Sequence, residues 1–144
     1  YLDMPEETAA TMTGGWLRTG DVGYLDTHGY LFIKGRTKDV IISGGFNIYP
    51  VDVEAVLATH GDVAESVVFG MPDAHWGERV EAVVELKAGA TTTPEDIVAH
   101  CKKHLAGFKV PRTVVFGELP KTSTGKIQKF ALRQQAGSAA AIDV

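Results

Sequence analysis

The sequence predicts an α+β fold in which a central three-stranded sheet is flanked by helices. The first observation is that three segments have the length and the β-branched composition of strands. The second is that segments with helical spacing of apolar residues precede, separate and follow these strands. The three predicted strands of the sheet are residues 65–71, 80–87 and 112–116.

The N-terminal segment, residues 1–37, begins with a predicted helix that extends to about Met12, because an aspartate cap and a proline precede acidic residues. Gly14 and Gly15 end this helix. Three short strands follow, and the segment carries too little apolar surface for a core of its own. We therefore expect it to belong to a larger domain. The short strands are expected at residues 16–19, 22–26 and 30–34.

The small domain, residues 38–135, begins after a polar connector with a strand at 40–43 and a loop at 44–49. Pro50 then starts a helix whose apolar residues share one face. The strand 80–87 alternates in polarity, so one of its faces is expected to be wetter than the other. The remaining elements are a helix at 94–105 capped by Thr93, a helix at 126–135, and a disordered tail at 136–144.

Composition excludes several classes of function. Of the 144 residues, 44% are hydrophobic and 22% charged, and the net charge is -4 without a basic block. These values argue against nucleic acid as a partner. The sequence predicts no membrane span, because no apolar run approaches the roughly 20 residues needed. The single cysteine, Cys101, excludes an internal disulfide and fits a cytoplasmic protein.

Three motifs follow one another along the chain. Residues 121–126 read Lys-Thr-Ser-Thr-Gly-Lys, which places Lys126 beside a glycine turn. This is not a phosphate-binding P-loop, since Pro120 and Ile127 stand where that motif needs glycine and serine or threonine. The other motifs are Trp-Leu-Arg-Thr-Gly-Asp at 16–21 and Gly-Arg-Thr-Lys-Asp-Val-Ile-Ile-Ser-Gly-Gly at 35–45.

In this order and spacing, the motifs resemble those of the adenylate-forming acyl-CoA synthetases, the AMP-binding enzymes that include fatty-acyl and aryl-CoA ligases. The resemblance covers residues 13–134 and is to the C-terminal portion of such enzymes. It implies a ligase that converts a carboxylic acid and ATP to an acyl-adenylate, and then transfers the acyl group to CoA. Mg²⁺ would accompany ATP, the missing N-terminal domain would be the partner, and the fragment alone would be inactive with no tightly bound cofactor.

The resemblance also implies roles for residues near the start of the chain. Asp21 would bind the ribose hydroxyls of ATP or AMP, and Arg36 would contact the ribose or the phosphates. Lys38 would be the hinge between the large and small domains. Without the resemblance, Asp21 would be read as part of an Asx turn between strands, and Arg36 and Lys38 as a solvated turn.

The resemblance implies that Lys126 is the catalytic residue, whose ammonium would stabilise charge that collects as the carboxylate attacks the α-phosphate. The loop that holds Gly44 and Gly45 would move into the active site for the second step, and one of these two glycines would line the pantetheine tunnel. Trp76, Phe108 and Lys109 would hold the CoA nucleotide, and Val110 stands where some relatives carry another basic residue. Without the resemblance, Trp76 would be read as a residue that covers the core, and Gly44 and Gly45 as a plain turn. Lys126 would be read as a surface lysine before a helix.

Other functions stay open from the residues alone. His100 and His104 share a helix face near Cys101, but ligands that would complete a metal site are missing, so we predict none. One alternative to the ligase is a non-catalytic binding or regulatory module. Another is a ligase that loads a carrier protein instead of free CoA.

Overall fold

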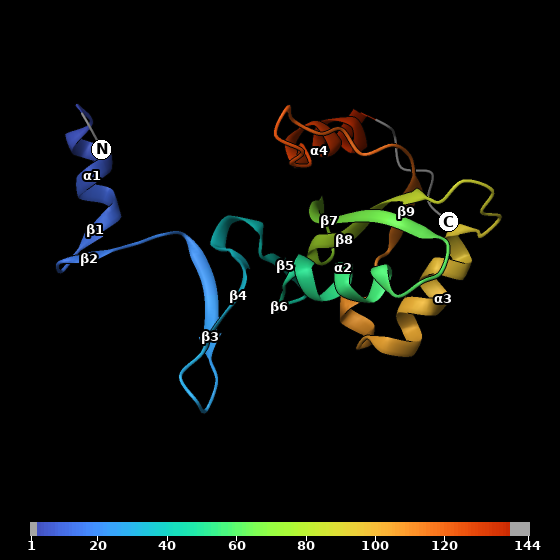
Figure 1. Cartoon of the computed structure of the whole chain (residues 1–144), viewed down its shortest axis with the longest axis horizontal. Helices are drawn as coiled ribbons and strands as arrows, with labels where there is room; N and C mark the ends of the chain where they lie inside the picture. The colour runs from blue at the N-terminus through green and yellow to red at the C-terminus, as the bar shows by residue number, and fades with distance from the viewer. Residues whose placement is uncertain (1–2, 139–144) are drawn as a thin grey trace. The chain divides into compact units, whose positions relative to one another are not determined.

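The computed structural model describes residues 3–138, and the chain divides into two compact units, Tyr1–Lys38 and Asp39–Val144 (Figure 1). Among the described residues, no helix is long and apolar enough to cross a membrane.

The first unit consists of a helix and two hairpins. Helix α1 spans Pro5–Thr11 and begins at a proline followed by Glu6 and Glu7. Most of the apolar side chains here are exposed, and no described residue of this unit is buried. The two antiparallel strand pairs are β1 (Met12–Thr13) with β2 (Trp16–Leu17), and β3 (Asp21–Leu25) with β4 (Leu31–Arg36).

The second unit is built on a five-stranded sheet with the order β6-β5-β8-β7, to which β9 adds in parallel beside β8. Its strands are β5 (Ile41–Ser43), β6 (Phe46–Ile48), β7 (Val63–Asp73), β8 (Gly77–Leu86) and β9 (Thr113–Phe116). Its helices are α2 (Pro50–Ala58), α3 (Pro94–His104) and α4 (Lys129–Ser138), with the 3₁₀ turns η1 (Thr37–Asp39) and η2 (Gly107–Lys109).

The predicted three-stranded sheet is therefore too small, because the hairpin β5–β6 joins it. Residues 44–49, expected as a loop, contain β6 instead. Gly44 and Gly45 have φ values of +57° and +84°, which a two-residue hairpin turn requires. The chain reverses at these glycines, and Phe46 then pairs with Ser43.

Both faces of the sheet are covered. Helices α2 and α3 pack on one face, over a cluster that includes Leu57, Val68 and Ile97, and α4 covers the other face (Figure 1). The sequence predicts that one face of strand 80–87 is more exposed to water, and this prediction is wrong for the middle of the strand. Val83 and Glu81 point toward the α4 side, where both are buried.

The two C-terminal helices differ in how well the sequence predicts them. The cap of α3 is confirmed, because the Thr93 hydroxyl accepts the Asp96 N–H and the Asp96 carboxylate accepts the Thr93 N–H. The last helix, α4, starts at Lys129 rather than at residue 126 and continues to Ser138. The first residues of the predicted tail are therefore helical, and residues 139–144 lie outside the described part of the chain.

Candidate functional site

The predicted site residues fall into three separate groups. Asp21, Arg36 and Lys38 belong to the first unit. The turn Gly44–Gly45 and the residues Trp76, Phe108 and Lys109 gather around one end of the sheet in the second unit. Lys126 occupies a loop before α4.

Asp21 and Arg36 are brought together by the hairpin β3–β4, where they are paired residues of the register. The Arg36 Nε lies 3.5 Å from Asp21 Oδ1, and both side chains are exposed by 41% or more. Arg36 Nη2 also donates to the Thr19 carbonyl oxygen at 3.1 Å. A carboxylate in this setting keeps lone pairs directed to solvent, where it can accept hydrogen bonds from a diol.

Lys38 is exposed in the 3₁₀ turn η1, at the boundary between the two units. The turn begins where the Thr37 N–H donates to the Gly20 carbonyl oxygen at 2.8 Å. This bond ties the chain back to the loop that precedes Asp21, immediately before Lys38.

Gly44 and Gly45 differ in their surroundings. The Gly44 N–H donates to the Trp76 carbonyl oxygen at 2.9 Å, and a Cβ on Gly44 would lie 2.9 Å from the Trp76 ring. A Cβ on Gly45 would meet nothing within 4 Å. Gly44 therefore packs against the indole, whereas Gly45 faces open space.

Trp76 lies in the tight turn between β7 and β8. The Asp73 carboxylate holds this turn by accepting the His75 and Trp76 N–H groups at 2.9 Å. Both hydrogen bonds lower the pKa of Asp73 below its ordinary value, and the bond from the Trp76 N–H has the larger effect. The indole is 38% exposed, and the Arg112 guanidinium lies 4.7 Å from its ring centroid. A cation and an aromatic surface thus adjoin Gly44.

Phe108 and Lys109 lie in η2. The Phe108 ring stacks on Phe46 with 4.6 Å between centroids, and Lys109 Nζ lies 3.8 Å from Asp52 Oδ2. No ring contact joins Phe108 to Trp76 among residues 3–138. The structure therefore places two aromatic surfaces at this end of the sheet, and each has its own neighbours.

Sequence reasoning missed Phe46 and Arg112. The pair Gly44–Gly45 is a hairpin signal, and it could have placed Phe46 on a strand beside the turn. Arg112 gave no local signal, because its position over Trp76 depends on the parallel pairing of β9 with β8. Val110 belongs to the buried core, so a basic residue at that position would be buried too.

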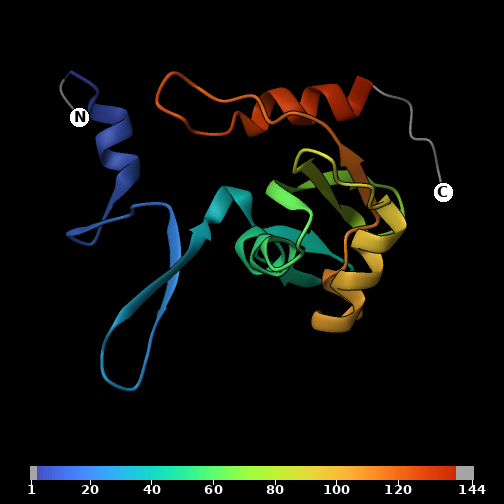
Figure 2. The ribbon, with the colours of Figure 1, turned by 45° about the vertical axis from the view of Figure 1, so that its right-hand side comes forward.

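Lys126 lies in a hairpin-like loop that extends beyond the N-terminal end of α4 (Figure 2). The Thr122 N–H donates to the Lys126 carbonyl oxygen at 2.7 Å, and the Lys126 N–H donates to the Thr122 hydroxyl at 3.2 Å. Gly125 supplies the positive φ of +83° that the turn needs. The Lys126 side chain is exposed, and its ammonium has no partner among residues 3–138, so it is available to an incoming anion.

Lys121, the other lysine of this motif, is fixed instead. Its ammonium lies 2.6 Å from Glu65 Oε2 on β7, and this hydrogen bond raises the pKa of Lys121 above its ordinary value. Lys121 therefore anchors one side of the loop, whereas Lys126 is presented at the other.

The histidines of α3 contact neighbouring polar groups and rings. His100 Nε2 lies 2.9 Å from the Thr59 hydroxyl and 3.1 Å from the Val56 carbonyl oxygen. The rings of His60 and His104 both adjoin it. Within residues 3–138, no group of three or more potential ligands is arranged to hold a metal ion. Burial raises the pKa of the nearby Cys101 thiol to about 11.

The second unit also matches a known family. The sequence profile described as "AMP-binding enzyme C-terminal domain" matches residues 52–126, which is more than half of the chain. The chain belongs to this family. The match includes Trp76, Phe108, Lys109 and Lys126, whereas the glycine turn and the first unit lie before it.

Similar proteins extend the likeness to both units. The chain is 53% identical to the 2-methylpropanoate–CoA ligase CCL4 of Humulus lupulus over 98% of its length, and 49% identical to the oxalate–CoA ligase of Arabidopsis thaliana over 93%. Its structure resembles ATP-bound MatB from Rhodopseudomonas palustris, with a TM-score of 0.89 and 41% identity over 94% of this chain. The chain spans only 26% to 27% of the length of these three proteins.

Proposed function

We propose that the chain is the C-terminal part of an ATP-dependent acyl-CoA synthetase that works in the cytoplasm. In the first step, a carboxylate attacks the α-phosphate of ATP, and acyl-adenylate and pyrophosphate are released. In the second step, the thiol of CoA attacks the acyl carbonyl, and acyl-CoA and AMP are released. The two steps use different surfaces of the second unit in turn, through a movement about Lys38. Isolated, the chain is expected to be inactive.

Lys126 serves the first step in this proposal. The attack gathers negative charge on the α-phosphate oxygens and on the departing pyrophosphate. A lysine ammonium that reaches these oxygens stabilises that charge more in the transition state than in the ground state. The observation that carries the proposal is the exposed Lys126 ammonium, which the turn at Thr122–Lys126 presents without a partner among the described residues.

Asp21 and Arg36 bind the nucleotide. The Asp21 carboxylate accepts the two ribose hydroxyls, because a carboxylate has acceptor sites for both. Arg36 Nε is already 3.5 Å from Asp21 and orients the carboxylate, and its remaining donors are free to meet ribose or phosphate oxygens. Mg²⁺ enters with ATP as part of the substrate.

The second step uses the glycine turn and its aromatic neighbours. Gly45 has open space where a side chain would stand, which leaves room for a pantetheine arm. The exposed faces of Trp76 and Phe108 offer stacking surfaces for adenine, and Lys109 offers a charge for phosphate.

The test replaces Lys126 by alanine in the full-length enzyme and measures the two steps separately. ATP–pyrophosphate exchange should fall by roughly 10²–10³, and thioester formation from supplied acyl-adenylate should stay within about twofold of the parent enzyme. The matched control is Lys103→Ala, which removes an exposed lysine from α3 and should change neither step.

Three outcomes would contradict different parts of the proposed function. An equal fall of both steps in Lys126→Ala would mean that the lysine does not act in adenylation alone. A parent enzyme that supports no ATP–pyrophosphate exchange with any carboxylic acid would favour a non-catalytic module. Transfer to a carrier protein but not to free CoA would assign the second step to a carrier-loading ligase.

A further inference from the structure

The glycine turn is carried by a hairpin whose attachment to the sheet is unusual. Strand β5 pairs with β8 only at Ser43 and Gly77. Continuing this antiparallel register would place Ile42 opposite Glu78 and join their backbones. No bridge pairs Ile42 with Glu78, however, and the Ile42 N–H bonds a side chain in place of a backbone carbonyl.

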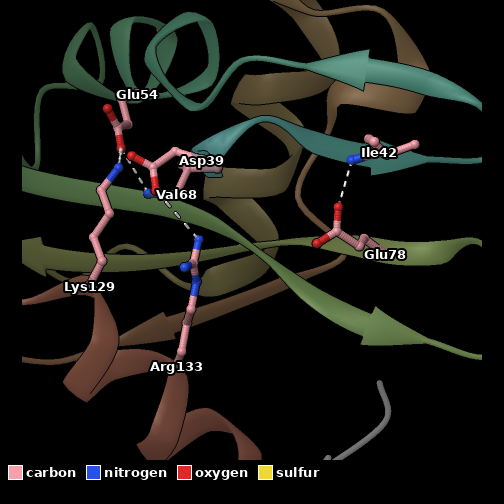
Figure 3. Close-up of polar contacts among 7 residues, drawn as sticks. All are labelled: Asp39, Ile42, Glu54, Val68, Glu78, Lys129 and Arg133. Carbon is pink, nitrogen blue, oxygen red and sulfur yellow. Dashed lines mark hydrogen bonds and ion pairs between the residues drawn. The ribbon is translucent and has the colours of Figure 1, made fainter. Parts of the chain in front are cut away.

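The side chain of Glu78 supplies that acceptor. Its Oε2 accepts the Ile42 N–H at 2.6 Å, and Figure 3 shows the carboxylate directed at the backbone of β5. A hydrogen bond to an ionised acceptor is roughly twice as strong as one between neutral groups. The carboxylate therefore stands in for a backbone carbonyl as the acceptor of the Ile42 N–H, next to the Ser43–Gly77 bridge.

Gly70 leaves the space that this contact needs. It lies on β7 opposite Val80, and a Cβ there would stand 2.8 Å from Glu78 Oε1 and 3.2 Å from Ile41 Cγ2. Any larger residue would push against both the carboxylate and the first buried residue of β5. The position of the Glu78 side chain is thus set by the neighbouring strand.

Two hydrogen bonds near the turn tie the hairpin to β8 and to the turn before β8. Ile41 and Ile48 are buried at its base, but the Ile42 side chain is 55% exposed and adds little packing. Between this base and the turn, the hairpin is tied to β8 and the adjoining turn through the Ile42 N–H bond to Glu78 and the Gly44 N–H bond to Trp76. Losing the first would remove the bond nearest the base, and the turn would then depend on the Gly44–Trp76 contact and on the stacking of Phe46 on Phe108.

We propose that Glu78 is a positioning residue for the thioester-forming step, because it fixes the hairpin that presents Gly44 and Gly45. The inference rests on the proposed function, in which that turn serves CoA. It assigns Glu78 to the second step only, since its carboxylate contacts the glycine hairpin and not the loop of Lys126.

Strand β8 also provides a matched control. Near its other end, Glu85 Oε2 accepts the Leu119 N–H at 3.1 Å, at the start of the loop that leads to Lys126. Glu78 and Glu85 thus have the same chemistry on the same strand, but they hold different loops. Glu85→Ala should affect adenylation more than thioester formation.

The experiment compares Glu78→Ala, Glu78→Gln and Glu85→Ala in the full-length enzyme. For Glu78→Ala, thioester formation from supplied acyl-adenylate should fall roughly tenfold or more, since small misplacements are costly. ATP–pyrophosphate exchange should stay within about twofold. Glu78→Gln keeps an acceptor oxygen and should recover most of the thioester rate. Glu85→Ala should show the reverse pattern.

Amide hydrogen exchange provides a readout independent of activity. Exchange at Ile42 and Gly44 should become faster in Glu78→Ala and stay close to the parent rate in Glu85→Ala. Unchanged exchange at Ile42 would overturn the positioning role, as would an equal loss of both steps in Glu78→Ala. If exchange rises as expected but the parent enzyme has no thioester activity, the proposed function fails and the assignment of Glu78 to that step fails with it.

Discussion

Trp76 and Phe108 illustrate how two exposed aromatic residues at one end of a sheet can act separately. Trp76 packs against Gly44 and beneath Arg112, whereas Phe108 stacks on Phe46. Each keeps about two fifths of its surface exposed, at 38% and 40% respectively. Both therefore retain a face that a planar ligand could cover.

Replacing Trp76 and Phe108 by alanine in the full-length enzyme should raise the KM for CoA and leave ATP–pyrophosphate exchange intact. Each lost stacking surface should cost about 1–3 kcal/mol of CoA binding. Steady-state kinetics with varied CoA measure this. Phe130→Ala is the control, since it removes an exposed ring from α4. An unchanged KM for CoA would assign both rings to structure alone.

Glu81 is a carboxyl group whose environment opposes ionisation. It is only 3% exposed, and this burial raises its pKa above the ordinary value of 4.5, although Arg79 Nη2 at 3.5 Å partly offsets the effect. The folded state therefore holds the proton more tightly than the unfolded state does. Its contribution to stability falls as the pH rises from about 4.5 through the raised folded pKa.

Glu81→Gln should remove this pH dependence. Relative to the parent chain, the variant should gain unfolding free energy as the pH rises from 4.5 toward neutrality, because glutamine does not ionise. Urea unfolding across that range measures the difference between the two proteins. A difference that stays constant, or that moves in favour of the parent chain, would show that the ion pair with Arg79 outweighs the cost of burial.

Helix α4 connects packing to the candidate catalytic loop. Leu132 is buried against β7 and β8 with Phe69, Met71 and Val83. Ion pairs at 3.9 Å join Lys129 to Glu54 on α2 and Arg133 to Asp39 (Figure 3). Glu54 Oε1 also accepts the Val68 N–H at 3.0 Å, which ties α2 to β7. Leu132 is thus the buried apolar anchor of the helix, Ala136 packs beside the same cluster, and the ion pairs at the surface add little.

Leu132→Ala should therefore lower the free energy of unfolding by about 2–5 kcal/mol, as expected for a buried leucine. Chemical denaturation of the chain checks this value. The control is Gln135→Ala on the exposed side of the same helix, which should stay within about 0.5 kcal/mol of the parent. A loss in Leu132→Ala no larger than in the control would mean that α4 is not anchored by this side chain.

The elements that the sequence predicts correctly are those with strong local signals. Thr93 and Asp96 form the expected capping box, and the alternating or apolar segments form β7, β8 and β9. The errors occur where distant residues decide the structure. The face of β8 expected to be more exposed to water is covered by α4. The helix expected from residue 126 begins later, because the Gln128 N–H donates to the Pro120 carbonyl oxygen.

The candidate site follows the same rule. Lys126 and the glycine turn stand out because their motifs are contiguous in sequence. Arg112, Glu78 and Phe46 do not, because each meets its neighbour only through the tertiary fold. A carboxylate that accepts a backbone N–H thirty-six positions away has no signature in a single sequence.

At the scale of the whole molecule, the proposed function requires that Lys126 and the Gly44–Gly45 turn take part in successive steps. Both lie in the second unit, on different loops, and the chain enters this unit directly after Lys38. If the unit rotates about that residue, the backbone torsions of Lys38 must change between the two steps. The ammonium of Lys38 is not needed for that movement.

The most direct test of this alternation measures both half-reactions in Lys38→Pro and Lys38→Ala variants of the full-length enzyme. Proline restricts φ to about −65° and removes an N–H donor, so it should leave adenylation near normal and lower CoA transfer by orders of magnitude. Alanine removes the charge but keeps the torsional freedom, and should leave both steps near normal. Equal damage by alanine would make the side chain responsible, and two intact steps in the proline variant would contradict a hinge at Lys38.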